Sequence, residues 1–224
     1  MKGARFTGGY RGKMKYKTEQ EKFWAGDFGS EYIERSRGEQ RIASNTAFFT
    51  RILERTSNVR SVIELGANIG INLRAIRRLL PHVEVSAVEI NDKAVKELRF
   101  IDGIEVFHQS VLDFTPARKW DLVFTKGLLI HINPEMLGQV YDLANMSSSR
   151  YVLFCEYYNP TPVEIIYRGH SDKLFKRDFA GEFLDRHNDF ELLDYDFVYH
   201  RDSNFRQDDI TWFLLKNRYP LRQE

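Results

Sequence analysis

Short apolar runs alternate with amphipathic segments from residue 61 onward, and this alternation constrains the fold most. Seven runs have strand character: SVIEL, VEVSAVEI, IEVFH, WDLVFTKGLLI, RYVLFCE, FELLDYDFVYH and DITWFLLK. Helical patterns separate most of them, as in INLRAIRRLL, DKAVKELRF, NPEMLGQVYDLANM and FAGEFLDRH. Because strands that alternate with helices form parallel crossover units, the sequence predicts an α/β fold. We expect a three-layer sandwich around a mostly parallel, seven-stranded sheet with one antiparallel late strand.

The length of 224 residues and the 42% hydrophobic content predict one domain over residues 18–224. Residues 18–58 would form a helical cap in front of its sheet. The first 17 residues carry six Lys or Arg and no acid, and we expect a disordered basic arm there. No base-stacking pattern follows the arm, so nucleic acid is not an expected partner. No apolar run spans a membrane and no secretory signal stands at the start, which favours a cytoplasmic protein.

The stretch VIELGANIG predicts a buried strand that breaks into a tight loop and then opens a helix. In such sheets ligands bind beyond the carboxyl ends of the strands. The stretch departs from the G-x-G-x-x-G pattern of dinucleotide sites and from the Gly-Lys-Ser/Thr ending of phosphate-binding loops. Its acid-x-Gly-x-x-x-Gly pattern suits a cationic ligand instead. Glu64 would attract an amino or sulfonium group, while Gly66 and Gly70 let the backbone approach it.

Two further strand ends carry polar residues. Glu89 ends the second strand 23 residues after Gly66, where a carboxylate can accept hydrogen bonds from both hydroxyls of a ribose. Ser110 and Val111 follow the third strand and could form the wall of an adenine site. Together these positions predict a nucleoside-containing ligand.

These residues resemble the Rossmann-like S-adenosylmethionine-dependent methyltransferases. ELGANIG is similar to their first motif, VEIN to their ribose-binding acid, and WDLVFTKGLLIHI to the segment beside the methyl donor. The resemblance implies S-adenosylmethionine as cofactor and S-adenosylhomocysteine as product. It places the methionine end at Glu64, Gly66, Ala67, Asn68 and Gly70, the ribose at Glu89, the adenine at Ser110 and Val111, and the methyl group near Lys126, Gly127 and His131.

A closer resemblance covers residues 17–217. KTEQEKFWAGDFGSEYIERS, EYYNPTPVEIIYRGHSDKLFKRDFAGEFL and DFVYHRDSNFRQDDITWFLLKN resemble the methylases associated with pseudaminic acid biosynthesis. The resemblance implies a small-molecule partner, a nonulosonic sugar or its activated form, methylated at oxygen.

The flanking segments supply candidate residues for the acceptor side. The polar and aromatic segment 157–178 predicts a lid over the substrate, and arginines in it and in YHRD could bind a carboxylate or phosphate. The candidate substrate-binding residues are Tyr157, Tyr158, Asn159, Tyr167, Arg168, Arg177, Asp178, Tyr199 and Arg201. The candidate catalytic bases are His131, Glu156, His170 and His200. The segment EKFWAGDFGSEY could close over the donor with Trp24, Phe28 and Tyr32, because aromatic faces suit a sulfonium cation.

Two other functions are compatible with the same residues. A carboxyl or amino methyltransferase acting on an amino acid or peptide group would need an anion-binding arginine but little base catalysis. A regulatory protein would bind S-adenosylmethionine without turnover. The histidines show no pairing at ligand spacing, so we expect no metal site.

Overall fold

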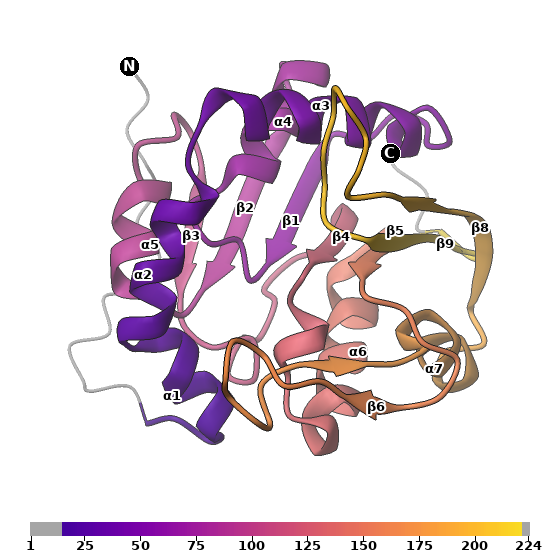
Figure 1. The fold of residues 1–224 in the computed structure, drawn as a ribbon. Coiled ribbons are helices and arrows are strands. Elements are labelled where there is room, and N and C mark those ends of the chain that lie inside the picture. Colours follow the sequence, from indigo (N-terminus) through magenta and orange to yellow (C-terminus); the bar gives the residue numbers. More distant parts are fainter. Residues whose placement is uncertain (1–14, 221–224) are drawn as a thin grey trace. The chain divides into compact units, whose positions relative to one another are not determined.

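Figure 1 shows the computed structural model of the chain, which describes residues 15–220. The chain divides into two compact units, Met1–Phe114 and Thr115–Glu224, which we call the N-terminal and C-terminal units. The predicted disordered arm covers residues 1–17, and its first 14 residues lie outside the described part. Lys17 is bound to the N-terminal unit, because its Nζ lies 2.6 Å from Asp113 and donates to the carbonyl of Leu112 over 2.7 Å.

The N-terminal unit contains three parallel strands and five helices among its described residues. Its elements are α1 (Glu19–Ala25), α2 (Asp27–Ser36), α3 (Glu39–Leu53), β1 (Ser61–Leu65), α4 (Ile71–Leu79), β2 (Glu84–Glu89), α5 (Asp92–Leu98) and β3 (Glu105–His108). β2 pairs with β1 on one side and with β3 on the other. α5 packs on β2 and β3, α3 packs along α4, and α2 runs beside α5 (Figure 1).

Local sequence explains where the helices that frame this unit begin. Thr18 and Glu21 form a capping box at the start of α1, in which each side chain binds the other residue's backbone N–H. Asn91 caps α5 by accepting from the backbone N–H of Lys93 and Ala94. α4 buries Leu73 and Ile76 completely, as its apolar spacing predicts.

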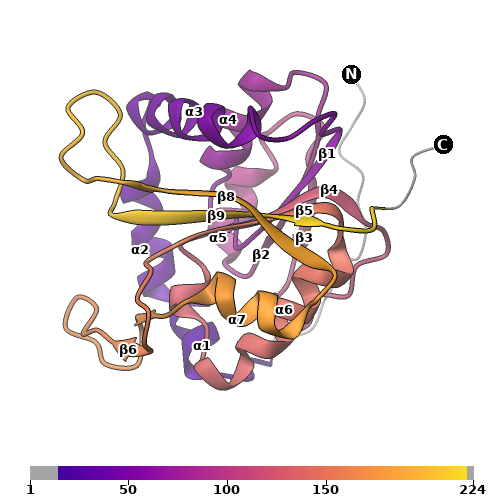
Figure 2. The ribbon, with the colours of Figure 1, turned by 90° about the vertical axis from the view of Figure 1, so that its right-hand side faces the viewer.

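The C-terminal unit holds the remaining strands. Its elements are β4 (Trp120–Lys126), the short 3-10 helices η1 (Leu129–His131) and η2 (Pro134–Met136), α6 (Leu137–Ser147), β5 (Ser148–Glu156), β6 (Val163–Glu164), β7 (Phe175–Lys176), α7 (Phe179–Arg186), β8 (Phe190–Val198) and β9 (Ile210–Asn217). β4 and β5 are parallel, and β9 runs antiparallel to both β5 and β8. Phe154 of β5 packs against Tyr141 of α6 and Phe183 of α7, with ring centroids 6.2 and 5.3 Å away. The β6–β7 hairpin and the β8–β9 loop both project from this unit (Figure 2).

The strand order of the seven-stranded sheet is β3-β2-β1-β4-β5-β9-β8. The predicted α/β class, with a mostly parallel seven-stranded sheet and one antiparallel late strand, is confirmed. No helix among residues 15–220 combines the length and the apolar character that crossing a membrane requires.

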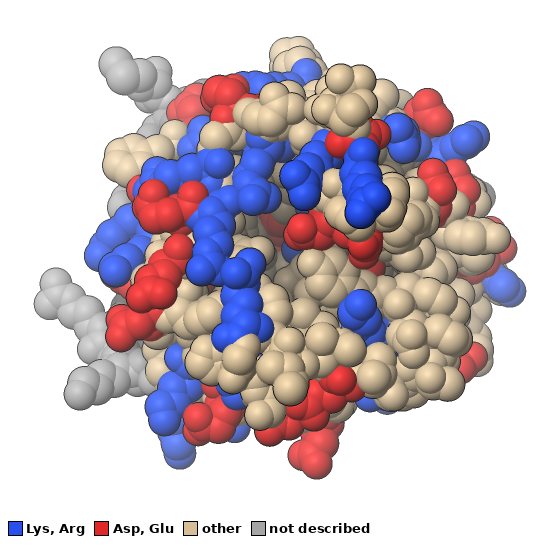
Figure 3. All heavy atoms as spheres, viewed as in Figure 1, with Lys and Arg blue, Asp and Glu red and all other residues tan. Residues whose placement is uncertain are grey.

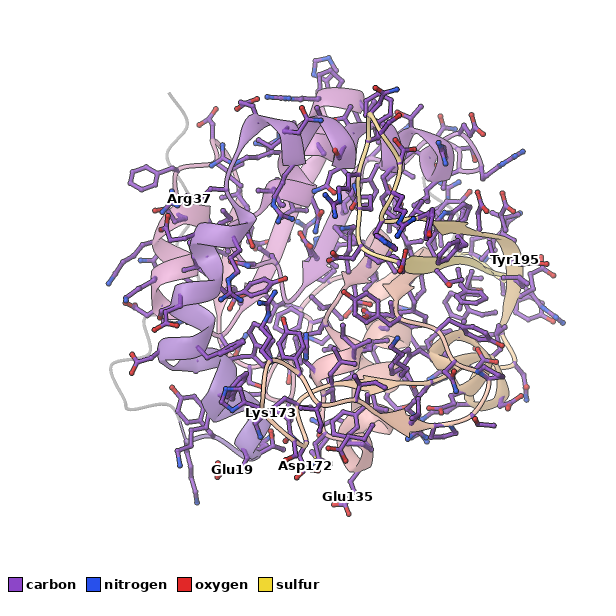
Figure 4. The ribbon with its side chains drawn as sticks, in the orientation of Figure 1. Glu19, Arg37, Glu135, Asp172, Lys173 and Tyr195 are labelled. Carbon is purple, nitrogen blue, oxygen red and sulfur yellow. The ribbon has the colours of Figure 1, made fainter. Side chains whose placement is uncertain are left out.

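On the face that Figure 3 shows, Lys and Arg side chains lie beside Asp and Glu side chains. Arg37, at the end of α2 (Figure 4), illustrates the pairing, because its guanidinium lies 3.1 Å from Glu34 and 3.1 Å from Glu97. These exposed pairs raise the pKa of Arg37, mainly through the hydrogen bonds to Glu97 and Glu34. Exposed pairs of this kind contribute little to stability.

Candidate functional site

The loop between β1 and α4 is held against β2 by its own backbone. The N–H groups of Gly66 and Ala67 both donate to the carbonyl of Val88, over 2.9 and 3.1 Å. Gly66 and Gly70 each have a φ of +75°, a conformation that glycine adopts at little cost. Asn68, at the tip, has a positive φ of 48°. The loop therefore has the tight form that its two glycines predict.

The packing around Gly70 is also close. A Cβ atom at this position would lie 2.6 Å from Ile101 Cδ1 and 2.7 Å from Leu98 Cδ2. Both are apolar side chains of the core beneath the loop. The core thus fixes how closely the loop approaches α5.

Glu89 lies at the carboxyl end of β2 and is 8% exposed. Its two carboxylate oxygens each accept one backbone hydrogen bond of 2.7 Å, Oε1 from Asn91 and Oε2 from Asn68. Burial raises the pKa of Glu89, and the backbone N–H groups of Asn91, Asn68 and, more weakly, Ile90 counteract that effect. These bonds fix the orientation of the carboxylate and leave lone pairs that could accept from ligand hydroxyls.

Glu64 ends a chain of buried side chains in the same unit. Asn72 Nδ2 donates to Glu64 Oε1 over 2.6 Å, and Asn45 Nδ2 donates to Asn72 Oδ1 over 2.8 Å. Glu64 is 1% exposed, so a buried carboxylate stands directly below the loop. The chain fixes its orientation, as a site for a cationic ligand group would need.

Ser110 and Val111 are buried in the segment after β3. Ser110 Oγ accepts from the N–H of Leu112 over 3.0 Å, and its carbonyl accepts from Asp113 N–H. The hydroxyl hydrogen of Ser110 is not used by these bonds. Since Lys17 binds Leu112 and Asp113, the residue just before the N-cap of α1 is attached to this same segment.

The aromatic residues of α1 and α2 form one cluster. The Trp24 ring meets Phe28 and Tyr32 edge-on, with centroids 5.5 and 5.4 Å away, and Phe23 stacks on Phe28 at 4.1 Å. All four side chains are half-buried. Trp24, Phe28 and Tyr32, which the sequence predicts to close over the donor, therefore lie in one aromatic cluster.

In the C-terminal unit, Glu156 organises the loop that follows β4. Its carboxylate accepts hydrogen bonds from Thr125 Oγ1 at 2.7 Å, Leu128 N–H at 3.1 Å and Ile130 N–H at 3.4 Å. The residue is 3% exposed, and burial raises its pKa to about 7. The sequence makes Glu156 a candidate base, and this role stays a prediction. Its three observed contacts hold the loop.

His131 lies at the end of η1 under the β6–β7 hairpin. Its Nδ1 lies 2.5 Å from the carbonyl oxygen of Lys173 and, since a carbonyl only accepts, donates to it. Burial lowers the pKa of His131 to about 4, while this hydrogen bond opposes the shift. His131 is therefore neutral at physiological pH, with the proton on Nδ1 and the lone pair on Nε2.

The β6–β7 hairpin occupies much of the segment predicted to be a lid. Its turn closes through two backbone hydrogen bonds between Tyr167 and His170, of 2.9 and 3.0 Å. Tyr167 lies over the His131 ring with centroids 5.0 Å apart, and the guanidinium of Arg168 lies 5.6 Å from the Tyr167 ring. Asp172 and Lys173 follow in the same loop (Figure 4). The structure thus brings His131 and Tyr167 together, whereas His170 is exposed.

The β8–β9 loop carries a second group of candidates. Lys126, at the end of β4, donates to Gln207 of this loop over 3.1 Å. Gly127 has a positive φ of 69° and donates its N–H to the carbonyl of Cys155. His200 Nδ1 lies 2.9 Å from Asp209, and Tyr199 packs against the His200 ring at 4.6 Å. Arg201 is exposed beside them.

Two predicted substrate residues, Arg177 and Asp178, make contacts that hold α7. Arg177 Nε pairs with Glu182 over 2.6 Å, and Tyr141 donates to the other oxygen of that carboxylate over 2.8 Å. Asp178 caps α7 by accepting from Gly181 N–H over 2.9 Å. Tyr158 and Asn159 pair with the backbone at Arg177, and Lys176 lies over the Tyr157 ring at 5.4 Å. Arg177 and Asp178 therefore anchor the start of α7.

Sequence reasoning missed Asn45, Asn72 and Asn91. Asn45 lies three residues after Ile42 and four before Phe49, on the inward face of α3, where a polar residue signals a buried hydrogen-bond partner. Asn91 follows the strand-ending acid by two residues, a helix-capping position. Across residues 15–220, no three His, Cys, Asp or Glu side chains gather into a group that could hold a metal ion.

Comparison with known proteins finds solved structures of similar fold but no similar sequence. No family model matches the sequence, and no curated protein is significantly similar to it. A Burkholderia thailandensis 1,6-didemethyltoxoflavin-N1-methyltransferase, solved with its substrate and S-adenosylhomocysteine, is 16% identical, with a TM-score of 0.65 over 92% of each chain. The magnesium protoporphyrin IX methyltransferase of Synechocystis PCC 6803, solved with S-adenosylhomocysteine, is 15% identical, with a TM-score of 0.63 over 90% of this chain and all of that one.

A third structure, described as a DhpI-SAM-HEP complex, is 18% identical, with a TM-score of 0.60 over 88% of this chain and 96% of its own. At such identities the likeness concerns the fold. This chain therefore has the Rossmann-like methyltransferase fold.

Proposed function

We propose that this protein is a methyltransferase that uses S-adenosylmethionine to methylate a small molecule. The observation that carries the proposal is the carboxylate of Glu89, held by one backbone N–H on each oxygen beside the glycine-containing loop. An oriented carboxylate of this kind suits the two hydroxyls of a ribose. Glu64 below the loop suits the cationic methionine end of the donor, and Ser110 and Val111 suit the adenine.

The chemistry proposed is an in-line displacement. An acceptor lone pair attacks the methyl carbon, the carbon–sulfur bond breaks, and S-adenosylhomocysteine leaves with the bonding electron pair. A hydroxyl acceptor must also lose its proton, and general-base catalysis of such a step contributes about 10²–10⁴-fold. His131 is our proposed base, because its lowered pKa keeps Nε2 unprotonated and the carbonyl of Lys173 fixes the tautomer.

A sugar acceptor methylated at oxygen is the finer proposal. It rests on the resemblance of three long segments to methylases associated with pseudaminic acid biosynthesis. The base chemistry available at His131 and the tyrosines of the hairpin support it, since hydroxyl acceptors need a base and sugar rings pack on aromatic faces. The structural neighbours act on chemically different small molecules, so the acceptor must be found by experiment.

A second candidate, carboxyl methylation, is favoured by the exposed Arg168 over Tyr167. A guanidinium in this position could hold a carboxylate in two parallel hydrogen bonds. Such an acceptor is already ionised and needs no base. Substituting His131 by Ala should therefore lower the rate of methyl transfer by about 10²-fold or more for a hydroxyl acceptor but leave it nearly unchanged for a carboxylate.

Calorimetric titration with S-adenosylhomocysteine, with NAD as the comparison ligand, tests the donor assignment. We expect binding of S-adenosylhomocysteine alone, and its loss in Glu89→Ala. Glu84→Ala is the matched control, because Glu84 is an exposed acid at the opposite end of the same strand. Undiminished binding by a folded Glu89→Ala variant would refute the ribose role. Binding of NAD in place of S-adenosylhomocysteine would refute the donor itself.

A further inference from the structure

Asn91 uses its side chain in two directions. Its Oδ1 accepts from the backbone N–H of Lys93 and Ala94, over 3.0 and 3.2 Å, and so caps α5. Its Nδ2 donates to the carbonyl of Trp24 over 3.0 Å and also faces the carbonyl of Gly26 at 3.4 Å. The last carbonyls of a helix have no partner within the helix, and the amide of Asn91 supplies one at the end of α1. The residue is 3% exposed.

Asn68 makes an equivalent connection to α2. Its Nδ2 donates to Ser36 Oγ over 3.1 Å at the last residue of α2, and Ser36 Oγ donates in turn to the carbonyl of Tyr32 at 3.4 Å. The backbone N–H groups of Asn68 and Asn91 are the two that bind the oxygens of Glu89. The carboxylate of Glu89 therefore binds both asparagines. Asn91 holds the end of α1, and Asn68 holds the end of α2.

The junction between α1 and α2 is tightly packed at the point where Asn91 binds. A Cβ atom at Gly29 would lie 1.9 Å from the carbonyl oxygen of Trp24, so the first turn of α2 rests directly on the end of α1. Asn91 Nδ2 also donates to Ser30 Oγ, over 3.3 Å. A displacement at this junction would move both helices, and the aromatic cluster of Trp24, Phe28 and Tyr32 with them.

We propose that Asn91 is a positioning residue of the donor site, which couples the aromatic cluster of α1 and α2 to the carboxylate of Glu89. The inference rests on the proposed function and extends it to residues outside the donor pocket. When ribose hydroxyls bind Glu89, they stabilise the hydrogen bonds that its carboxylate accepts from the N–H groups of Asn68 and Asn91. Through these residues they also stabilise the ends of α1 and α2. Because such coupling is reciprocal, ordering α1 and α2 strengthens donor binding by the same factor.

Asn91→Ser separates this role from helix capping. Serine is as good a cap for α5 as asparagine and is uncharged, but its short hydroxyl cannot reach the carbonyl of Trp24. Asn133→Ser is the matched control, since Asn133 caps η2 by accepting from Glu135 N–H. The measurements are calorimetric affinity for S-adenosylhomocysteine, hydrogen exchange of residues 19–36 with and without this ligand, and thermal unfolding.

We expect Asn91→Ser to bind S-adenosylhomocysteine roughly tenfold more weakly, within the range of about 5–150-fold found for coupled sites. The ligand should slow exchange over residues 19–36 in the wild type and in Asn133→Ser, but not in Asn91→Ser. Ser36→Ala removes only the hydrogen bond from Asn68 to α2. It should show a smaller loss of affinity and a smaller loss of the ligand-induced slowing of exchange. It also serves as the second variant should Asn91→Ser fold poorly.

The outcomes distinguish this inference from the proposed function. Weaker binding by Asn91→Ser or Ser36→Ala with wild-type exchange over residues 19–36 would overturn the coupling, because the substitution would then act at Glu89 alone. Wild-type affinity in both variants would overturn it as well. Failure of the wild type itself to bind S-adenosylhomocysteine would overturn the donor assignment and the coupling with it.

Discussion

Thr125 on β4 donates its hydroxyl hydrogen to Glu156 on β5 across 2.7 Å, at the carboxyl ends of two parallel strands. The same carboxylate accepts from the backbone of Leu128 and Ile130, so it joins the strand pair to the loop that ends at His131. Two buried titratable groups, Glu156 and His131, are thus linked through one short loop. Burial shifts their pKa values in opposite directions.

Glu156→Gln should become relatively more stable than the wild type as pH rises. Burial raises the pKa of Glu156 from 4.5 to about 7. An acid with a raised pKa contributes stability that is fully present below pH 4.5 and is lost as pH rises through 7. Since each pKa unit corresponds to about 1.4 kcal/mol, the variant should gain up to about 3 kcal/mol on the wild type between pH 4.5 and 8. Urea unfolding across this range measures the difference.

The exposed Glu135 supplies the control for that experiment (Figure 4). Glu135→Gln makes the same chemical change at an exposed position and is measured in parallel. Parallel stability curves for Glu156→Gln and the wild type would mean that Glu156 does not titrate in this window.

His131→Gln should become relatively less stable than the wild type as pH rises. The pKa of His131 is lowered from 6.5 to about 4, so the neutral form is the one that folding favours. Its contribution to stability is present above pH 6.5 and is lost as pH falls through 4. In the wild type the two trends oppose each other between pH 4.5 and 6.5, and a nearly flat contribution from this pair is expected. Removing either residue should expose the slope of the other in the same urea experiment.

Gly29→Ala should destabilise the N-terminal unit by about 1–3 kcal/mol, as overpacking of a close contact does. The new methyl group would lie 1.9 Å from the carbonyl oxygen of Trp24, a backbone atom that cannot move aside alone. Gly138→Ala is the matched helical control, because its Cβ would meet only the side chain of Arg186, at 3.5 Å or more. That substitution should be neutral or stabilising by up to about 1 kcal/mol. Equal melting temperatures for the two variants would contradict the packing at Gly29.

Asn45→Ala and Asn72→Ala should be coupled in a double-mutant cycle. Each removes a buried partner from the chain that ends at Glu64 and should cost about 1–3 kcal/mol. The double variant should cost less than their sum by about 1 kcal/mol, because the first substitution already breaks the chain. Asn72→Ala combined with Asn145→Ala, which lies in the other unit and contacts His187, should be additive. Additivity in both cycles would show that the chain is not cooperative.

Much of this fold can be predicted from the sequence because its signals are local. The run SVIEL becomes β1 without change of bounds, and INLRAIRRLL becomes α4 except for its last residue. The glycine pattern predicts the loop between them, since positive φ at Gly66 and Gly70 is a local property. The acid at the end of β2 falls at the position expected for a ribose-binding residue.

The remaining features depend on contacts between residues far apart in the sequence. The sequence around Glu156 does not show that its carboxylate accepts from Thr125, Leu128 and Ile130, because these donors lie at least 26 residues away. The sequence predicts a substrate-binding role for Asp178, and the structure adds that it caps α7 by accepting from Gly181 N–H. The short strands β6 and β7 contain two residues each, too few to give a periodic pattern.

The hydrogen bond between His131 and the hairpin bears on how substrate preference could evolve. Its acceptor is the main-chain carbonyl of Lys173, a group that every amino acid carries. Side chains along the hairpin can therefore be replaced without removing the acceptor that orients the imidazole, provided that the backbone keeps its course. A lineage could change the side chains of this segment while the orientation of the His131 imidazole is retained.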